Sequence, residues 1–236
     1  MKKLNQELNQ LHVKKALDIA TRTGDFALTL ARELGSYEEI IAIDIDEKAM
    51  EKGKAKLGEI PGLRFEKQDG CHTAYPDHSF DLIGISNSLH HFPDLEALFA
   101  EIRRLLAPGG TLVVNEMPRD RQEGAAASHF LLHYWDCSVD TARGVFHRKN
   151  YSCAEILDIL KKHGVVVEKD FLDQPTDPQL VPPLIKRVEN MEEKLEKVKD
   201  APDYQAMKAE MDKVRQHYNR YGMARANQYV VFGKME

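Results

Sequence analysis

Three acidic residues occupy positions from which carboxylates can hold a nucleotide-like ligand. Asp18 lies in a short apolar run that leads through a turn of small residues to Gly24, and Asp44 stands twenty residues beyond that glycine. Asp69 follows the next short run, in the sequence Gln-Asp-Gly. A tight turn from a strand into a helix brings backbone N–H groups close to a ligand, and a carboxylate at the position of Asp44 can accept hydrogen bonds from both hydroxyls of a ribose. The spacing therefore predicts a nucleotide-type site, with Asp69 near an adenine amino group; the alternative is that these carboxylates only cap turns.

Histidines are the candidates for proton transfer. The ordinary pKa of imidazole suits a general base near neutral pH, and the side chains selected for this role are His90, His91 and His133. The competing interpretation of the His90-His91 pair is a structural connection between a strand and a helix. Contact with a substrate is expected from Tyr134, Trp135, Phe146 and Arg148.

The three cysteines point away from a metal or disulfide framework. Cys71, Cys137 and Cys153 are an odd number and have no CxxC spacing. We therefore expect reduced thiols and no metal site.

The elements that must position these residues alternate along the chain. Short apolar or β-branched runs alternate with amphipathic stretches from residue 13 to 167, which is typical of a parallel sheet with helical crossovers. The expected strands are 15–20, 39–44, 63–68, 80–86, 110–116 and 165–172, and the expected helices between them are 25–34, 46–57, 94–106 and 153–163. A turn at Pro108-Gly109-Gly110 is expected to close the third helix.

Two segments interrupt the alternation. Residues 118–150 carry aromatic side chains with weak periodicity, which fits either a partly helical cover over a pocket or an ordinary surface connection. In residues 181–226, apolar residues recur at steps of three and four on both sides of Asp200-Ala-Pro-Asp203, which predicts a helical hairpin. Its apolar seam is expected to be core packing, with a lid or a homodimer contact as the alternatives. The run 227–235 is expected to be a final strand.

The run LDIATRTGDFALTLA resembles the first motif of class I S-adenosylmethionine-dependent methyltransferases, as found in the ubiquinone and menaquinone methyltransferase group. IIAIDID, QDGCHTAYPDHSFDLIGISNSLHHFPD and RRLLAPGGTLVV resemble the later landmarks in order, so the resemblance covers roughly residues 13 to 173 and the last strand. It implies S-adenosyl-L-methionine as cofactor. The cofactor-binding residues that it implies are Asp18, Ala20, Arg22, Gly24, Asp44, Ile45, Asp69, Gly70, Ser86 and Asn87.

The resemblance also implies a fold. It is a Rossmann-like, doubly wound α/β fold whose seven-stranded sheet has an antiparallel last strand beside the fifth. The expected methyltransferase domain is residues 1–180 and 227–236, with 118–150 as a lid, and the helical hairpin 181–226 is an insertion.

Two features depart from the family pattern. The positions that usually hold alternating glycines are here Ala20, Arg22 and Gly24. Arg22 must point away from the ligand or occupy the pocket, and the position can demand a positive φ, which costs a residue with a Cβ. Only about a dozen residues precede the first strand, room for at most one short helix.

Composition and charge disfavour two classes of function, nucleic-acid binding and membrane insertion. The chain has 236 residues, 42% of them hydrophobic, and a net charge of -5, which argues against nucleic acid as a partner. No apolar stretch reaches the roughly 20 residues of a membrane span, so a cytoplasmic protein is expected. We predict methyl transfer to a small molecule, with a hydrophobic or aromatic acceptor favoured. The alternatives are a methyltransferase-like binding or regulatory partner whose cofactor site is impaired by Arg22, and a nicotinamide-dependent oxidoreductase, for which the G-x-G-x-x-G pattern is missing.

Overall fold

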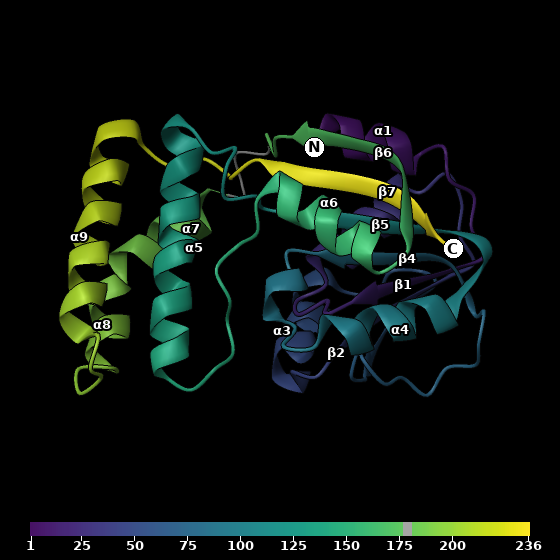
Figure 1. The fold of residues 1–236 in the computed structure, drawn as a ribbon, viewed down its shortest axis with the longest axis horizontal. Helices are drawn as coiled ribbons and strands as arrows, with labels where there is room; N and C mark the ends of the chain where they lie inside the picture. The colour runs from purple at the N-terminus through teal and green to yellow at the C-terminus, as the bar shows by residue number, and fades with distance from the viewer. Residues whose placement is uncertain (177–180) are drawn as a thin grey trace. The chain divides into compact units, whose positions relative to one another are not determined.

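The computed structural model describes residues 1–176 and 181–236, which form two compact units (Figure 1). The sheet unit comprises residues 1–116, 156–173 and 229–236, and the helical unit comprises residues 117–155 and 174–228. Each unit is described by itself below.

The sheet unit is built on seven strands in the order β3-β2-β1-β4-β5-β7-β6. Their bounds are β1 Lys15–Ile19, β2 Glu39–Asp44, β3 Leu63–Lys67, β4 Phe80–Ser86, β5 Leu106–Glu116, β6 Val165–Asp173 and β7 Gln228–Met235. Strands β1 to β5 pair in parallel, and β7 runs antiparallel beside β5. The expected fold class, including the place and direction of the last strand, is confirmed.

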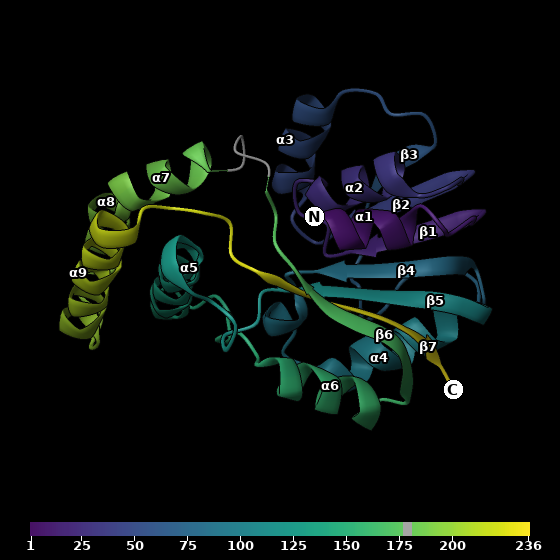
Figure 2. The same cartoon turned by 90° about the horizontal axis from the view of Figure 1, so that it is seen from above.

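Helices cover both faces of this sheet. The helices α1 (Lys2–Leu8), α2 (Asp25–Glu33) and α3 (Glu47–Leu57) lie on one side of the strands, and α4 (Leu95–Leu105) and α6 (Cys153–Lys162) lie on the other (Figure 2). Leu4 and Leu8 of α1 are fully buried in a core shared with α2 and the strands. Strands covered on both faces are continuous apolar runs, as in β1 and β2.

Local sequence signals set the helix ends. The Asp46 side chain accepts from the Ala49 N–H at the start of α3, and Gly58 ends that helix. A capping box precedes α6, because the Ser152 N–H donates to Glu155 and the Glu155 N–H donates to the Ser152 hydroxyl.

The fifth strand begins earlier than expected. It starts at Leu106 rather than Gly110, directly after α4 ends at Leu105. Leu106 pairs with Phe80, and the register shifts before Leu82 pairs with Thr111. The Pro-Gly-Gly sequence is therefore an irregularity inside a strand and not the turn that closes the helix.

The helical unit packs a hairpin on a long helix. Its helices are α5 (Gly124–Ala142), α7 (Pro182–Glu189), α8 (Met191–Glu196) and α9 (Tyr204–Tyr221). Most residues of the predicted apolar seams are buried and share one core with Leu132, Trp135 and Val139 of α5, whereas Tyr221 at the end of the second seam is 45% exposed. The first arm of the hairpin is two short helices and not one, because the chain leaves helical geometry at Asn190, where ψ is 6°.

The expected domain boundary at residue 180 lies outside the described residues. The domain limits predicted from the sequence therefore stay a proposal. In the part of the chain that the structure describes, no helix combines the length and apolar content that spanning a bilayer requires. The short 3-10 helix η1 (Leu89–His91) follows β4 and carries two of the candidate histidines, His90 and His91.

Candidate functional site

The turn between β1 and α2 keeps the backbone of a glycine-rich loop although two of its alternating positions carry side chains. The φ angles are 57° at Ala20, 51° at Arg22 and 78° at Gly24. This left-handed region costs a residue with a Cβ about 1–2 kcal/mol. The Thr21 N–H donates to the Ile43 carbonyl at 2.9 Å, and the Gly24 N–H donates to the Thr21 carbonyl at 2.8 Å. Tertiary hydrogen bonds therefore hold the strained loop against β2.

Asp44 connects this loop to the end of β2. Its Oδ2 accepts from the Arg22 N–H at 2.8 Å, and its Oδ1 accepts from the Asp46 N–H at 2.8 Å. Each carboxylate oxygen has a second lone pair, so acceptor capacity is left for two hydroxyl groups. Next to it, the apolar side chain of Ile45 is 70% exposed. The pair offers a hydrogen-bonding oxygen and an apolar surface side by side.

The Arg22 side chain is exposed, and no residue in the described part of the chain pairs with its guanidinium. The arrangement of this side chain relative to a bound cofactor stays a prediction.

Asp18 is a buried carboxylate beneath the loop. Its side chain is 1% exposed, and its Oδ2 accepts from the Thr21 hydroxyl at 2.5 Å. Within residues 1–176 and 181–236, its buried Oδ1 has no hydrogen-bond partner. Burial raises the pKa of Asp18 to about 7, although the Thr21 hydroxyl opposes the shift. This oxygen can accept from a donor that the protein does not supply.

The ends of β3 and β4 add the remaining predicted residues. Asp69 is exposed and its Oδ1 accepts from the Cys71 N–H at 2.9 Å, while Gly70 is buried against Ile19 of β1. A Cβ on Gly70 would lie 2.6 Å from the Ile19 side chain, so this position has no room for one.

At the end of β4, the Ser86 hydroxyl accepts from the Asn115 amide at 2.8 Å, and Asn87 has a φ of 51°. The Ser88 hydroxyl donates to the Ser86 carbonyl at 2.8 Å, and its oxygen lies 3.4 Å from the Ala20 carbonyl oxygen, so this turn lies beside the first loop. The structure thus brings the ten predicted cofactor residues to one edge of the sheet, namely Asp18, Ala20, Arg22, Gly24, Asp44, Ile45, Asp69, Gly70, Ser86 and Asn87.

Glu116 is a site residue that the sequence analysis missed. Its Oε1 accepts from the N–H groups of Ser88 at 2.6 Å and Leu89 at 3.0 Å, and its Oε2 lies 3.2 Å from the His90 Nδ1. Both side chains are buried, at 2% and 0% exposure. A carboxylate on Nδ1 places the ring proton there and leaves Nε2 as the basic nitrogen. The signal was present, because Glu116 ends a predicted buried strand just as Asp44 does.

The other two candidate bases lie elsewhere. His91 is exposed, with its ring centroid 4.3 Å from that of His90. His133 lies on α5 in the helical unit, where its ring centroid is 5.0 Å from that of His147.

The expected substrate contacts are divided between core and surface. Trp135 is 1% exposed and its Nε1 donates to the Met207 carbonyl at 2.9 Å, so it is a core residue of the helical unit and not a substrate contact. Phe146 is 45% exposed, with the Arg148 guanidinium 5.9 Å from its ring centroid. Tyr134 accepts a hydrogen bond from the Lys149 ammonium at 2.5 Å.

The cysteines are free thiols with raised pKa values. Burial raises the pKa to about 11 for Cys71, about 12 for Cys137 and about 11 for Cys153. They are protonated at neutral pH, which disfavours nucleophilic catalysis by a thiolate.

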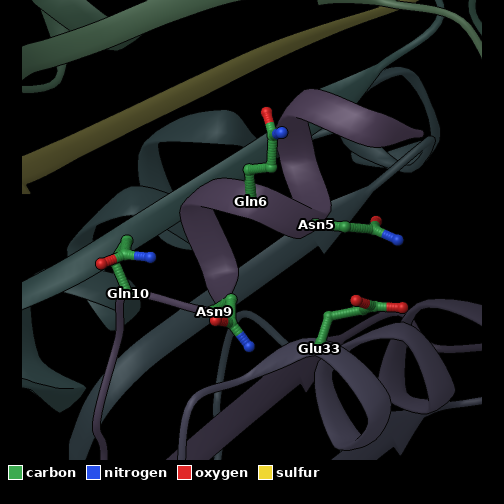
Figure 3. Close-up of a pocket in the computed structure, with 5 residues that line it drawn as sticks. All are labelled: Asn5, Gln6, Asn9, Gln10 and Glu33. Carbon is green, nitrogen blue, oxygen red and sulfur yellow. The ribbon is translucent and has the colours of Figure 1, made fainter.

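A surface hollow of about 270 Å³ lies at α1 and α2 (Figure 3). Its lining is polar and consists of Asn5, Gln6, Asn9, Gln10 and Glu33. Glu33 is the last residue of α2, whereas Gly24 precedes the first, so the hollow lies at the opposite end of the helix from the loop. It is therefore separate from the candidate site.

Comparison with known proteins finds a family that the central segment resembles. Residues 17–114 match the family model described as a methyltransferase domain. The match spans the strands and loops that carry the candidate site. It confirms the resemblance to class I methyltransferases, for which S-adenosylmethionine is the expected cofactor.

Relatives and structural neighbours agree. The methyltransferase domain is similar to demethylmenaquinone methyltransferase of Staphylococcus saprophyticus, 31% identical over 115 residues, which are 49% of this chain and 49% of that protein. The Staphylococcus aureus enzyme is 34% identical over 102 residues, 43% of this chain and 42% of that protein. The chain thus spans about half the length of the curated relatives it matches.

Among solved structures, the YcgJ protein of Bacillus subtilis superposes with a TM-score of 0.60 at 18% identity, covering 100% of this chain and 97% of that one. A SAM dependent methyltransferase of Aquifex aeolicus gives a TM-score of 0.54 at 19% identity, covering 72% of this chain and 81% of that one. At these identities the likeness concerns the fold alone.

Proposed function

We propose that the protein transfers a methyl group from S-adenosylmethionine to a small-molecule acceptor. The observation that carries this proposal is the hydrogen bond between the Arg22 N–H and the Asp44 carboxylate. It joins the strained loop after β1 to Asp44, the acidic last residue of β2. The loop and the carboxylate that would bind a nucleoside are therefore held in a fixed position relative to each other.

The residues present fit the cofactor. Asp44 keeps acceptor capacity for two ribose hydroxyls, and the exposed Ile45 side chain offers an apolar surface for an adenine ring. The buried Asp18 Oδ1, which no described residue satisfies, suits an ammonium donor such as that of the cofactor's amino acid group. The solvent-facing Arg22 guanidinium avoids repulsion with a sulfonium.

The cofactor supplies an electrophilic methyl group on sulfur. The chain must hold the acceptor in line with that group and exclude water, which provides most of the rate enhancement without a protein nucleophile. The protonated thiols of the three cysteines are consistent with this division of work.

We assign His90 as the base that removes a proton from an acceptor hydroxyl or acidic carbon. Glu116 fixes the His90 ring through Nδ1 and also holds the Ser88-Leu89 turn at the end of β4. Nε2 is then the atom that receives the proton. His91 and His133 stay as weaker candidates for the same role.

The acceptor is proposed from chemistry and relatives. The similar Staphylococcus enzymes are named for demethylmenaquinone, a quinone. We therefore propose an aromatic, quinol-like acceptor for this chain. The interpretation in which Arg22 impairs the cofactor site is less favoured, because the loop keeps the hydrogen bond between the Arg22 N–H and Asp44.

A transfer assay tests this function. Methyl-labelled S-adenosylmethionine would be incubated with the full chain and a series of reduced quinols that differ in ring substitution. The expected result is label in at least one quinol and none with Asp44→Ala. Binding of the cofactor product without transfer to any quinol would overturn the acceptor class, and absence of binding would overturn the methyltransferase proposal itself.

A further inference from the structure

Two histidines of the helical unit lie close together. His133 is on α5, and His147 follows the end of that helix. Their ring centroids are 5.0 Å apart with the ring planes at 65°, and one ring nitrogen of each lies within 4.8 Å of the other.

The chain returns to α5 to place His147. Gly144, with a φ of 78°, follows the helix, its N–H donates to the Thr141 carbonyl, and the Val145 N–H donates to the Asp140 carbonyl. The Thr141 hydroxyl, which donates to the Cys137 carbonyl at 2.8 Å, lies 3.4 Å from the His147 carbonyl oxygen. The loop therefore folds His147 back onto the last turns of the helix, where its side chain is 4% exposed.

Asp140 orients the His147 ring. The His147 Nδ1 lies 3.0 Å from the Asp140 Oδ2, and the Lys194 ammonium lies 3.2 Å from the Asp140 Oδ1. A carboxylate on Nδ1 leaves Nε2 as the ring nitrogen that can bind a metal ion. Metal-binding histidines almost always have this arrangement, with the second ring nitrogen donating to a carboxylate or carbonyl.

We propose that His133 and His147 bind a divalent transition-metal ion, with Asp140 as the positioning residue of His147. Imidazole nitrogens suit Zn²⁺, Cu²⁺ and Ni²⁺. Two nitrogens bound at about 2.0–2.1 Å to one tetrahedral ion are about 3.4 Å apart, so the two ring nitrogens, which lie within 4.8 Å of each other, would have to move up to roughly 1.4 Å closer. Water or further side chains complete the coordination.

The charges around the two histidines favour ions that bind imidazole nitrogen over ions that bind carboxylate oxygen. Asp140 is already contacted by Lys194, and the neighbouring Asp136 is contacted by both Lys194 and Arg187. With these carboxylates balanced, the hard, oxygen-seeking ions Mg²⁺ and Ca²⁺ gain little. The site goes beyond the proposed methyl transfer and does not depend on it.

Metal titration of the metal-free full chain tests the proposal. Zn²⁺ and Co²⁺ are expected to bind with a stoichiometry of one, and Co²⁺ is expected to show visible absorption bands of nitrogen coordination, whereas Mg²⁺ gives no heat. His133→Ala and His147→Ala should each weaken Zn²⁺ binding at least tenfold, and Asp140→Asn should weaken it about 10–100-fold.

A matched control separates this site from surface histidines. His72 is exposed and belongs to the sheet unit, so His72→Ala should leave Zn²⁺ affinity unchanged. Circular dichroism checks that each variant is folded. If His133→Ala is not folded, His133→Gln is measured in its place. Equal affinity of the wild-type chain and both histidine variants, loss of binding in His72→Ala, or no Zn²⁺ binding at all would overturn the proposal.

Discussion

The backbone N–H of Arg22 donates to the Oδ2 of Asp44 at 2.8 Å, while the Arg22 side chain is exposed. A main-chain group thus makes the contact that a glycine at this position would also make. The departure from the family pattern changes the side chain but preserves the hydrogen bond that shapes the site.

Replacing Asp44 by alanine should abolish tight cofactor binding. The variant loses the carboxylate that accepts from Arg22 and Asp46 and that would accept from the ribose. Charge-assisted hydrogen bonds contribute about 1.5–3 kcal/mol, so affinity for S-adenosylhomocysteine should fall roughly 10–100-fold by calorimetry. Glu47→Ala, which removes an exposed acidic residue paired with Lys67, is the control that should bind normally. Equal affinities for the two variants would contradict the assignment.

Replacing Arg22 by glycine should stabilise the protein. The φ of 51° costs a residue with a Cβ about 1–2 kcal/mol, and glycine removes this cost from the folded state. The greater conformational freedom of glycine in the unfolded chain lowers the resulting gain in stability by about 0.4–1 kcal/mol. A net increase of roughly 0.5–1 kcal/mol in the free energy of unfolding is expected in urea. Arg22→Ala keeps the backbone cost and should show no gain, so a gain in both variants would locate the effect in the side chain.

Replacing Gly24 by alanine should be costly. A Cβ there would lie 2.5 Å from Phe65 Cζ, and the φ is 78°. Backbone cost and overpacking together predict a loss of about 2–4 kcal/mol in the free energy of unfolding. Gly109→Ala is the matched control, because its φ is 77° and no atom lies within 4 Å of the added Cβ. Equal losses at the two glycines would exclude the clash with Phe65.

How much of this could be predicted from the sequence depends on how local the cause is. Strands 39–44 and 80–86 were predicted with their observed ends, since each is an apolar run bounded by polar residues. The start of β5 was wrong, because the pairing of Leu106 with Phe80 is a contact between distant segments that overrides the Pro-Gly-Gly signal. The break at Asn190 left no trace in the pattern, since Val188, Met191 and Leu195 keep their helical spacing across it.

The same limit applied to the site. The acidic residues at the strand ends could be predicted from the sequence because the position of each depends only on its own strand. The remaining cofactor residues were predicted from the family resemblance. The sequence does not reveal that Trp135 is a core residue, because its hydrogen-bond partner, Met207, lies 72 residues away in the chain. Glu116 was missed although it ends a strand, because its role depends on a turn 27 to 28 residues earlier.

The pKa of Asp18 makes stability depend on pH. The carboxyl ionises near its ordinary pKa of 3.8 in the unfolded chain and at about 7 in the folded one, so ionisation favours the unfolded state between these values. Its contribution to the free energy of unfolding is present below pH 4 and is lost as pH rises to about 7, a change on the order of 2–4 kcal/mol.

Asp18→Asn should remove this dependence. Urea unfolding at pH 4.5, 6 and 8 should show the variant gaining stability relative to the wild-type chain as pH rises. Glu59→Gln changes an exposed carboxylate elsewhere in the sheet unit and should follow the wild-type chain at every pH. A constant difference between Asp18→Asn and the wild-type chain would refute a raised pKa.

Glu116→Gln should reverse the tautomer of His90. The amide NH₂ replaces the oxygen facing Nδ1, so the ring proton moves to Nε2 and the base is lost. Nitrogen-15 shifts of the imidazole should report this change, and methyl transfer should fall about 10–100-fold. Glu101→Gln alters another buried carboxylate that accepts from a backbone N–H, that of Thr73, and should leave both readouts unchanged. An unaltered His90 tautomer in Glu116→Gln would refute the positioning role.

The most direct test of the central claim is calorimetric titration of the unaltered chain with S-adenosylhomocysteine. The Arg22–Asp44 geometry predicts one site with a dissociation constant near the micromolar range, about -8 kcal/mol. Absence of binding by the wild-type chain, with binding restored in Arg22→Gly, would contradict the claim that the strained loop is a working cofactor site.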